Sequence, residues 1–256
     1  MAILRLKHNV EIYYEVIGGS NERPYLVFLH EALGCTEMWK GFPALLCGET
    51  GHPGIVYDRV GHGKSSGLLK SRTLHYMHEH ALEELPTVLT ALIPGQQYIL
   101  IGHSDGGSIA LIHASAQPPD LKGIITEAAH IFVEEKTVQG VRAATEAFLA
   151  GKMGGLFRYH TGKTEKVFRA WSETWLSEWF QSWNIENLLP SIACPALILQ
   201  GSEDQYGTIA QVKSIASKVP MAQEKMLEGC GHASHKDRSE AVTQVMAKFL
   251  GHRYAD

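Results

Sequence analysis

The segment from Gly102 to Gly106 (Gly-His-Ser-Asp-Gly) constrains the fold more than any other part of this sequence, because it directly follows the apolar run Tyr98–Ile101. It matches the pattern G-x-S-x-G, in which a strand turns sharply into a helix and presents the serine hydroxyl at the turn. The serine of such a turn lies in a strained backbone region, at a cost of about 1–3 kcal/mol. The surrounding fold has to offset this strain, so a genuine turn of this kind also predicts the fold around it. The following residues, Gly106–Ala114, are mostly small and helix-compatible, as close packing on a strand requires.

Apolar runs typical of strands buried on both faces recur along the chain. They are Tyr25–His30, Ile55–Asp58, Tyr98–Ile101, Gly123–Thr126 and Ala196–Gln200. Helix-compatible segments alternate with them, namely Thr36–Leu46, Thr73–Leu92, Ser104–Ala116 and Thr208–Val219. A hairpin, Ile3–Leu6 with Val10–Ile17, precedes them. This order predicts an α/β fold with a doubly wound, mostly parallel sheet. Ligands bind such sheets beyond the carboxyl ends of the strands.

Residues 132–190 interrupt this alternation and predict several helices, beginning with Glu134–Ala150. We expect them to form a helical lid, inserted before the strand at 196–200. Residues 1–131 and 191–256 then form a single-domain core. Within the lid, four tryptophans at steps of four, from Trp171 to Trp183, share one predicted helical face. This face either packs on the body or lines a pocket, with Trp175 and Trp179 as candidate pocket residues.

The composition is that of an ordinary globular protein and argues against several kinds of partner. A net charge of −4 without a basic cluster disfavours nucleic acid and anionic membrane surfaces. No apolar run approaches the ~18–20 residues that span a bilayer, and the first residues lack signal-peptide organisation. The four cysteines lack metal-ligand spacing, so we expect a cytoplasmic protein with reduced thiols. The oligomeric state, monomer or homodimer, is left open.

A serine nucleophile needs a base, and the base needs an acid that orients it. Asp204 follows the strand at 196–200, and His232 follows the segment Glu224–Leu227. The order Ser104, Asp204, His232 is therefore the predicted catalytic triad. Two other acids and one other base compete for these roles. They are Glu203, Glu127 and His235, the last of which we expect to be solvated at a helix start.

An oxyanion hole needs two backbone N–H groups that point at the developing charge. We expect one from Asp105, which follows the nucleophile, and one from Ala32, in the loop after the strand at 25–29. The Asp105 carboxylate has two possible roles: it stabilises the start of the following helix, or it recognises a cationic group of the substrate. His130, after the strand at 123–126, is a further candidate for the pocket.

The remaining histidines and cysteines give no metal site. His75 and His78 share a helix face, but His80 does not, so we expect all three to be exposed helix residues. Cys230, close to His232, is expected to be a packing residue. The predicted chemistry therefore requires neither a metal nor an organic cofactor.

These motifs together resemble the α/β-hydrolase superfamily along nearly the whole chain. The matching segments are Leu29–Gly34, Asp58–Ser65, Gly102–Gly107, Gly201–Asp204 and Gly229–His232. The resemblance is greatest to small single-domain members with a helical lid, which include carboxylesterases, enol-lactonases and C–C bond hydrolases. It implies a serine esterase that acts on a small-molecule ester through an acyl-enzyme. Two alternatives stay open: enol-lactone, C–C bond or lyase chemistry with the same triad, and a catalytically idle ligand-binding protein.

One residue departs from the pattern of many relatives. Glu31 stands where they carry glycine after the histidine of the first loop, whereas the nearby Leu33–Trp39 resembles the enol-lactonase sequence. The Glu31 carboxylate either lies at the substrate pocket or pairs with Arg59 at the edge of the core. We favour the pair with Arg59, because buried carboxylates generally need a partner.

Overall fold

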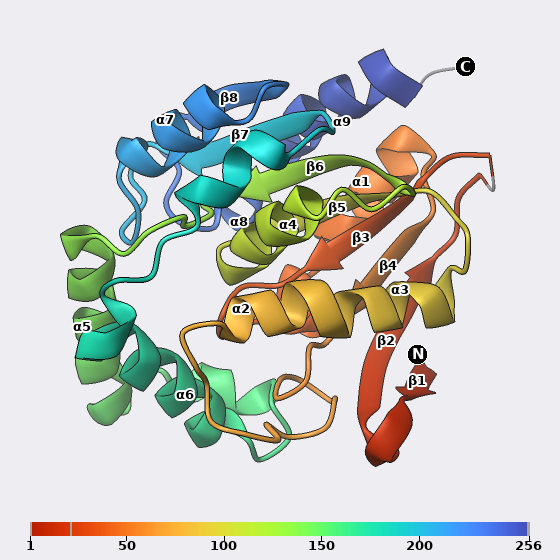
Figure 1. Ribbon diagram of the computed structural model, residues 1–256. Coiled ribbons are helices and arrows are strands. Elements are labelled where there is room, and N and C mark those ends of the chain that lie inside the picture. Colours follow the sequence, from red (N-terminus) through yellow and green to blue (C-terminus); the bar gives the residue numbers. More distant parts are fainter. Residues whose placement is uncertain (1, 21, 255–256) are drawn as a thin grey trace.

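The computed structural model describes residues 2–20 and 22–254, and its described part contains one eight-stranded sheet. The order across the sheet is β1-β2-β4-β3-β5-β6-β7-β8 (Figure 1). The strands are β1 (Ala2–Arg5), β2 (Glu11–Ile17), β3 (Tyr25–Leu29), β4 (Gly54–Tyr57), β5 (Tyr98–His103), β6 (Leu121–Glu127), β7 (Ala196–Gly201) and β8 (Ala222–Leu227). β1, β2 and β4 pair antiparallel, and every other pair is parallel. The predicted α/β fold with a mostly parallel sheet is confirmed.

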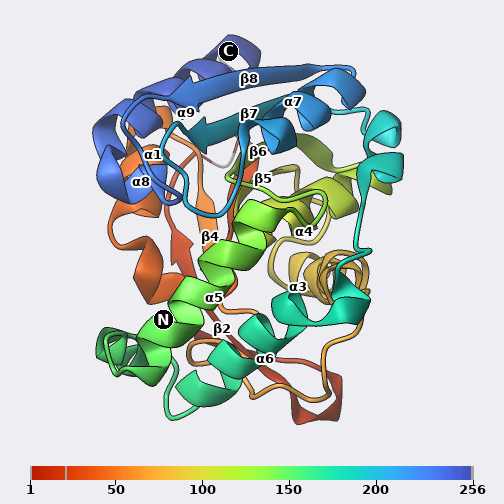
Figure 2. The ribbon, with the colours of Figure 1, turned by 90° about the vertical axis from the view of Figure 1, so that its left-hand side faces the viewer.

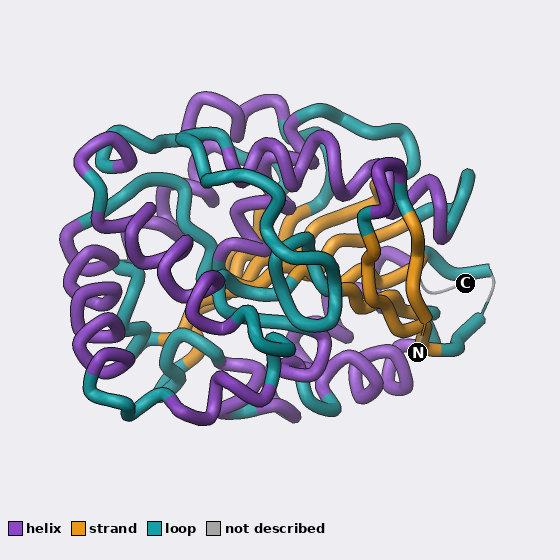
Figure 3. Tube along the Cα trace, turned by 90° about the horizontal axis from the view of Figure 1, so that it is seen from below, coloured by secondary structure: helices purple, strands orange, loops and turns teal. Residues whose placement is uncertain are grey.

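Helices cover both faces of this sheet (Figure 3). They are α1 (Phe42–Thr50), α2 (Tyr76–Glu79), a π turn (His80–Glu84), α3 (Leu85–Leu92), α4 (Asp105–Ser115), α5 (Glu135–Leu149), α6 (Thr164–Leu176), α7 (Ile209–Lys218), α8 (Ser234–Asp237) and α9 (Ser239–Tyr254). Short 3₁₀ turns occupy Lys7–Asn9, Thr36–Trp39, Gly154–Arg158, Glu178–Phe180 and Glu186–Ser191.

The core has two layers, because successive side chains of a strand point to opposite faces. In β3, Leu26 and Phe28 pack with α1 and α9 on one face, while Val27 and Leu29 pack on the other. The middle of each central strand is therefore apolar on both faces, as the continuous runs predicted. Burial on both faces places the polar ends of these strands at the sheet edge, where the candidate site lies.

Two predicted helices have different boundaries from those expected. The segment 36–46 is a 3₁₀ turn followed by α1, because Lys40 adopts a positive φ of 55° and interrupts the helix. In the segment 73–92, the helix begins at Tyr76 and widens into the π turn just before Pro86, whose missing N–H removes one helical hydrogen bond.

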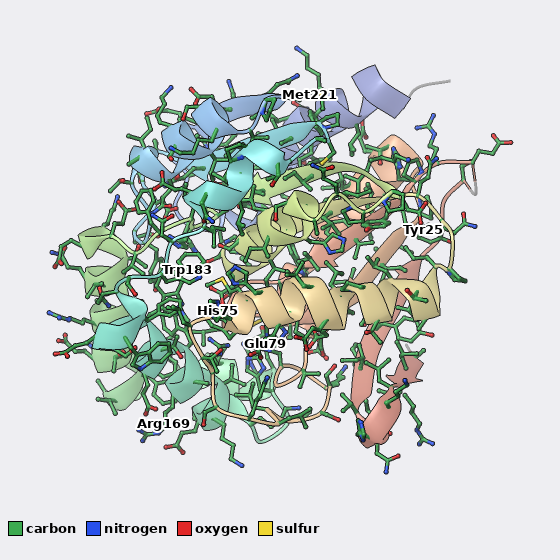
Figure 4. All side chains as sticks on the ribbon, in the orientation of Figure 1. Tyr25, His75, Glu79, Arg169, Trp183 and Met221 are labelled. Atoms are coloured by element: carbon green, nitrogen blue, oxygen red, sulfur yellow. The ribbon has the colours of Figure 1, made fainter. Side chains whose placement is uncertain are left out.

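Between β6 and β7, the described residues form helices and turns without a strand of the sheet. α5 and α6 lie at one end of the sheet, on the left in Figure 1 and facing the viewer in Figure 2. The predicted continuous helix through all four tryptophans is wrong, because α6 ends at Leu176 and Ser177 is extended. In Figure 4, Arg169 of α6 points outward, and Trp183 lies toward the interior. The division of the chain into a core and a lid stays a prediction, and residues 1, 21, 255 and 256 lie outside the described part.

No helix among the described residues is long and apolar enough to cross a bilayer. All four cysteines are free thiols, three of them buried. Cys230 is one of the three buried cysteines. It packs in the core layer between the sheet and helices α1 and α9. Its expected role as a packing residue therefore agrees with its surroundings.

Candidate active site

Ser104 occupies the turn between β5 and α4, with φ 53° and ψ −118°. The turn needs glycine on both sides of it. A Cβ atom on Gly102 would lie 2.2 Å from the Gly106 carbonyl oxygen, and one on Gly106 would lie 2.0 Å from the carbonyl oxygen of Leu29. Neither backbone oxygen has room to move, so any other residue would displace the strand or the helix. The glycines hold Ser104 in its strained conformation at the edge of a cavity.

Asp204 and His232 follow two neighbouring strands, β7 and β8, at the same sheet edge. His232 Nδ1 lies 2.8 Å from Asp204 Oδ1, which also accepts the N–H groups of Tyr206 (2.8 Å) and Gly207 (3.2 Å). Burial raises the pKa of Asp204, but its hydrogen bonds and the neighbouring His232 outweigh burial and lower it overall. An ionised Asp204 accepts a hydrogen bond from the Nδ1–H group of the ring, so Nε2 carries no proton and is available to the hydroxyl of Ser104.

Ser104 and His232 line the same cavity, although the serine hydroxyl makes no hydrogen bond to any described residue. In the absence of substrate, catalytic hydrogen bonds are often longer than in the reacting complex. The structure thus places Ser104 and His232 on one cavity and joins His232 to Asp204 by a hydrogen bond.

The competing acids and base lie elsewhere. Glu203 is exposed in the turn before Asp204. Glu127 pairs with His235, whose Nδ1 and backbone N–H both donate to its carboxylate, at 2.8 and 2.9 Å. The expectation that His235 is solvated is wrong, because only 2% of the residue is exposed. Burial alone would raise the pKa of Glu127, but its interactions with His235, including the two hydrogen bonds, outweigh burial and hold this pKa at about 2.

The backbone N–H groups proposed for the oxyanion hole belong to residues that line the cavity with Ser104. The N–H of Asp105 begins α4, so no earlier helical carbonyl accepts it. The N–H of Ala32 makes no hydrogen bond within the described chain. The guanidinium of Arg59 fixes the loop after β3 by donating hydrogen bonds to the carbonyl oxygens of His30 and Glu31.

The favoured pairing of the Glu31 carboxylate with Arg59 is wrong. Arg59 binds the backbone of the loop, while the Glu31 carboxylate accepts the N–H of Leu33 at 2.8 Å and lines the cavity. A guanidinium has several N–H groups and binds carbonyl oxygens as readily as carboxylates, so the sequence alone did not distinguish these partners. The alternative that placed Glu31 at the pocket agrees with the structure.

The Asp105 side chain is buried beside the cavity and accepts the hydroxyl of Tyr76 at 2.8 Å. Asp105 is the first residue of α4, where the positive end of the helix stabilises a carboxylate. Tyr76 keeps its proton, because burial and the charge of Asp105 raise its pKa well above the ordinary value. The tyrosine hydroxyl therefore donates, and the side-chain oxygen of Asp105 accepts.

The cavity has a volume of about 360 Å³. Its wall on the side of the helical insertion is largely apolar and comes from Thr137, Val141, Met153, Leu156, Trp171 and Trp175. The expectation that Trp179 lines the cavity together with Trp175 is wrong. Trp179 lies beyond the end of α6, is 47% exposed and does not line the cavity.

His130 lines the cavity, as expected. Its ring stacks on that of His232, with centroids 5.9 Å apart, and meets the edge of Trp175 at 5.3 Å. Burial and the neighbouring His232 lower the pKa of His130 to about 4, so this imidazole is neutral near pH 7. It therefore presents a neutral polar ring beside the base.

Two residues that support His232 were missed in the sequence. Gln205 Oε1 accepts the N–H of His232 at 3.2 Å, and Asp237 Oδ2 accepts the N–H of Gly231 at 2.8 Å. Both are close in sequence to the predicted triad, which is the signal that points to them. They fix the backbone on which the imidazole is carried.

His103, Glu127 and His235 are buried and bring their nitrogen and oxygen atoms within 4.8 Å of one another, as metal ligands would. His103 Nε2, however, donates to the carbonyl of His232 at 2.9 Å, and His235 binds Glu127. These atoms already have partners in the protein, so the cluster serves as a hydrogen-bonded support. His75 is exposed, as expected, but His78 and His80 are half-buried, so the expectation that they are exposed is wrong.

A model of the alpha/beta hydrolase family matches residues 26–245, and the chain belongs to that family. The 2-succinyl-6-hydroxy-2,4-cyclohexadiene-1-carboxylate synthase of Enterobacter sp. (strain 638) is 24% identical over 91% of this chain and 94% of its own. The proline iminopeptidase of Lactobacillus helveticus is 22% identical over 94% of each. A thermophilic esterase from Thermogutta terrifontis has the same fold, with a TM-score of 0.75 and 22% identity over the whole of both chains.

Proposed function

We propose that this protein is a serine hydrolase that cleaves carboxylic esters through an acyl-enzyme intermediate. The observation that carries the proposal is the position of Ser104, in a strained turn on the same cavity as a histidine that Asp204 holds through Nδ1. A serine with a base and an orienting acid is the arrangement of an activated nucleophile. Two free N–H groups, of Ala32 and Asp105, complete it.

The reaction follows from these groups. His232 Nε2 takes the proton of Ser104 as its oxygen attacks the ester carbonyl, and the N–H groups of Ala32 and Asp105 bind the oxyanion. The tetrahedral intermediate collapses, and His232 returns the proton to the departing alcohol. Water then attacks the acyl-enzyme while His232 takes one of its protons, and collapse releases the acid with the serine restored. Asp204 stabilises the imidazolium at both stages.

The cavity supports a small substrate that is not strongly anionic. Its volume of about 360 Å³ lies at the lower end for small-molecule sites. Glu31, Asp105 and Asp237 line it, against one cationic side chain, Lys236. The name of the related synthase describes a carboxylate that carries a succinyl group, and carboxylate groups would be repelled here. Neutral esters therefore suit the cavity better.

The proposal is tested by labelling with a fluorophosphonate and by the turnover of p-nitrophenyl butyrate. Wild-type protein should give a covalent adduct at Ser104 and release p-nitrophenol. Ser104→Ala should lose the adduct and at least about 10³-fold in kcat/KM. Ser115→Ala in the same helix, which donates to the carbonyl of Ile112 and does not line the cavity, is the matched control.

Each other outcome points to a different function. An adduct without ester turnover would favour the C–C bond, enol-lactone or lyase chemistry of the same triad. Absence of both adduct and turnover would favour a ligand-binding protein. Unchanged esterase activity in Ser104→Ala would refute the assigned nucleophile.

A further inference from the structure

The turn at residues 160–163, just before α6, is hydrogen-bonded to the loop that follows β4. Thr161 Oγ1 and Lys163 Nζ both donate to the carbonyl oxygen of Gly63, at 3.0 and 2.9 Å. The N–H of Gly63 in turn donates to Nδ1 of His160 at 2.9 Å. One turn of the helical insertion thus binds both backbone groups of Gly63.

The loop after β4 is a firm support for this turn. Asp58 Oδ1 accepts the N–H of Thr36 at 2.6 Å, and its Oδ2 accepts the N–H of Lys64 at 2.7 Å. Gly63 has a positive φ of 48°, and a Cβ atom on it would lie 1.9 Å from Asp58 Oδ2. The backbone of Gly63 is therefore packed closely against Asp58, and it fixes the position of the His160 ring.

The proton of the His160 ring is on Nε2. The residue is fully buried, and burial lowers its pKa below the ordinary value, so the ring is neutral. A neutral imidazole has one donor and one acceptor nitrogen. Since the N–H of Gly63 can only donate, Nδ1 is the acceptor and Nε2 is the donor. Nε2 lies 2.9 Å from the carbonyl oxygen of Leu33, to which it donates.

This hydrogen bond is the first of a series that ends at the proposed oxyanion hole. The carbonyl of Leu33 belongs to the same peptide group as the N–H of Gly34, which donates to the carbonyl oxygen of Glu31 at 3.0 Å. The carbonyl of Glu31 belongs to the same peptide group as the N–H of Ala32. In a planar trans peptide the C=O and N–H bonds point in opposite directions, so the direction of each carbonyl sets that of its N–H.

The two peptide groups of this series are held from different parts of the molecule. The carbonyl of Glu31 also accepts His30 Nδ1 at 2.7 Å and the guanidinium of Arg59 at 3.1 Å, both from the core. Within the described chain, the carbonyl of Leu33 has no donor other than His160. The insertion therefore fixes the peptide that the core leaves unsupported.

We propose that His160 is a positioning residue for catalysis. Its Nε2–H group holds the Leu33–Gly34 peptide and, through the carbonyl of Glu31, orients the N–H of Ala32 toward the oxyanion. The ring transfers no proton and does not touch the substrate. This inference rests on the proposed ester hydrolysis for its kinetic test, whereas the hold of His160 on the loop is measurable without turnover.

Two variants separate the roles of the two ring nitrogens. In His160→Asn the amide oxygen takes the place of Nδ1, so the acceptor for Gly63 is kept and the donor to Leu33 is lost. We expect kcat for p-nitrophenyl butyrate to fall about tenfold or more with KM within about twofold, because a misdirected oxyanion donor affects the transition state more than the bound ester. In His160→Gln the amide nitrogen reaches the place of Nε2, and kcat should stay within about threefold of wild type.

His113→Asn is the matched control. His113 is also a buried histidine with two partners, the carbonyl of Ala81 at 2.8 Å and the hydroxyl of Tyr98 at 2.7 Å, but it does not line the cavity or contact the loop after β3. This variant should lower the midpoint of urea unfolding and leave kcat unchanged. A loss of kcat as large as that of His160→Asn would assign both losses to general loosening and overturn the inference.

The inhibitor 1,1,1-trifluoro-2-hexanone probes the oxyanion hole directly. Ser104 Oγ adds to its carbonyl carbon, the hydroxyl proton passes to His232, and the ketone oxygen becomes an oxyanion. The inhibition constant should rise in His160→Asn by the factor by which kcat/KM falls, and His160→Gln should restore it. An unchanged inhibition constant in His160→Asn would overturn the inference.

Amide hydrogen exchange over residues 30–35, followed by mass spectrometry, measures the hold on the loop without turnover. Exchange should be faster in His160→Asn than in wild type, His160→Gln and His113→Asn. Turnover through Ser104 in the wild type, with unchanged kcat and exchange in His160→Asn, would leave the ester proposal standing and overturn this inference. Faster exchange in His160→Asn without turnover in the wild type would refute ester hydrolysis and support the hold of His160 on the loop. Equal losses of kcat in His160→Asn and His160→Gln would also overturn the inference.

Discussion

His103 Nε2 lies 2.9 Å from the main-chain carbonyl oxygen of His232, so the residue before the proposed nucleophile supports the segment that carries the proposed base. A carbonyl only accepts, so Nε2 carries the proton. Burial holds the pKa of His103 well below its ordinary value, which keeps the ring neutral. His103 is the last residue of β5 and pairs with Glu127, the last residue of β6. The rings of His103 and His235 are in edge-to-face contact, with centroids 5.0 Å apart. The Glu127–His235 pair thus braces this link.

Removal of the link should loosen His232 and slow catalysis. We expect His103→Ala to lower kcat about tenfold or more with little change in KM, because misplacement of a catalytic group affects the reacting geometry more than ground-state binding. His103→Gln keeps an N–H donor and should recover much of the loss. Kinetics with p-nitrophenyl butyrate, alongside thermal unfolding, provide the measurement. Equal losses in both variants would show that the ring is needed for packing alone.

The sheet and the proposed triad were predictable because their signals are local. A strand buried on both faces is apolar through its middle, so β3, β5, β6 and β7 each contain a continuous apolar run. The turn at Ser104 needs glycine on both sides, and the acid and base follow their strands directly. Each of these features depends on a few neighbouring residues.

Other features depend on contacts between distant segments. His235 and Glu127 are 108 positions apart, and nothing near either one indicates the other. The four-residue spacing of the tryptophans continues past the end of α6, so spacing alone placed Trp179 on a helix that stops at Leu176. Arg59 reaches the backbone of its loop rather than the Glu31 carboxylate, a choice that only the packed structure reveals.

The glycine requirement at the turn leads to a stability prediction. Gly106→Ala should destabilise the protein by about 3 kcal/mol or more, because its Cβ would lie 2.0 Å from the Leu29 carbonyl oxygen, and neither backbone segment can move away. Gly48→Ala in α1 is the control. No atom lies within 4 Å of its Cβ position, and alanine there should add about 0.5–1 kcal/mol. Urea unfolding measures both, and similar midpoints for the two variants would contradict the close approach.

The different positions of two tryptophans lead to a kinetic prediction. Trp179→Ala should leave kcat/KM for p-nitrophenyl butyrate within about twofold of wild type, since surface substitutions away from the site have small effects. Trp171→Leu changes the cavity wall and should raise KM several-fold. A larger effect at Trp179 than at Trp171 would mean that the exposed ring meets the substrate.

The buried Glu127–His235 pair predicts how stability depends on pH. The folded-state pKa of Glu127 is about 2, below its ordinary value of 4.5, so the ionised carboxylate stabilises the fold above about pH 4.5. This contribution is lost as the pH falls from about 4.5 toward 2, where the carboxylate becomes protonated in the folded state as well. A shift of this size corresponds to about 3 kcal/mol, and breaking a buried pair costs a similar amount.

Glu127→Gln should therefore unfold about 3 kcal/mol more easily than wild type at pH 7, and the difference should shrink as the pH falls below about 4.5. Glu203→Gln, an exposed acid at the same edge of the sheet, is the matched control and should stay within about 0.5 kcal/mol. Urea unfolding of the three proteins from pH 7 to pH 3 gives the comparison. A difference that is independent of pH would show that Glu127 stabilises the fold through shape and neutral hydrogen bonds, without its charge.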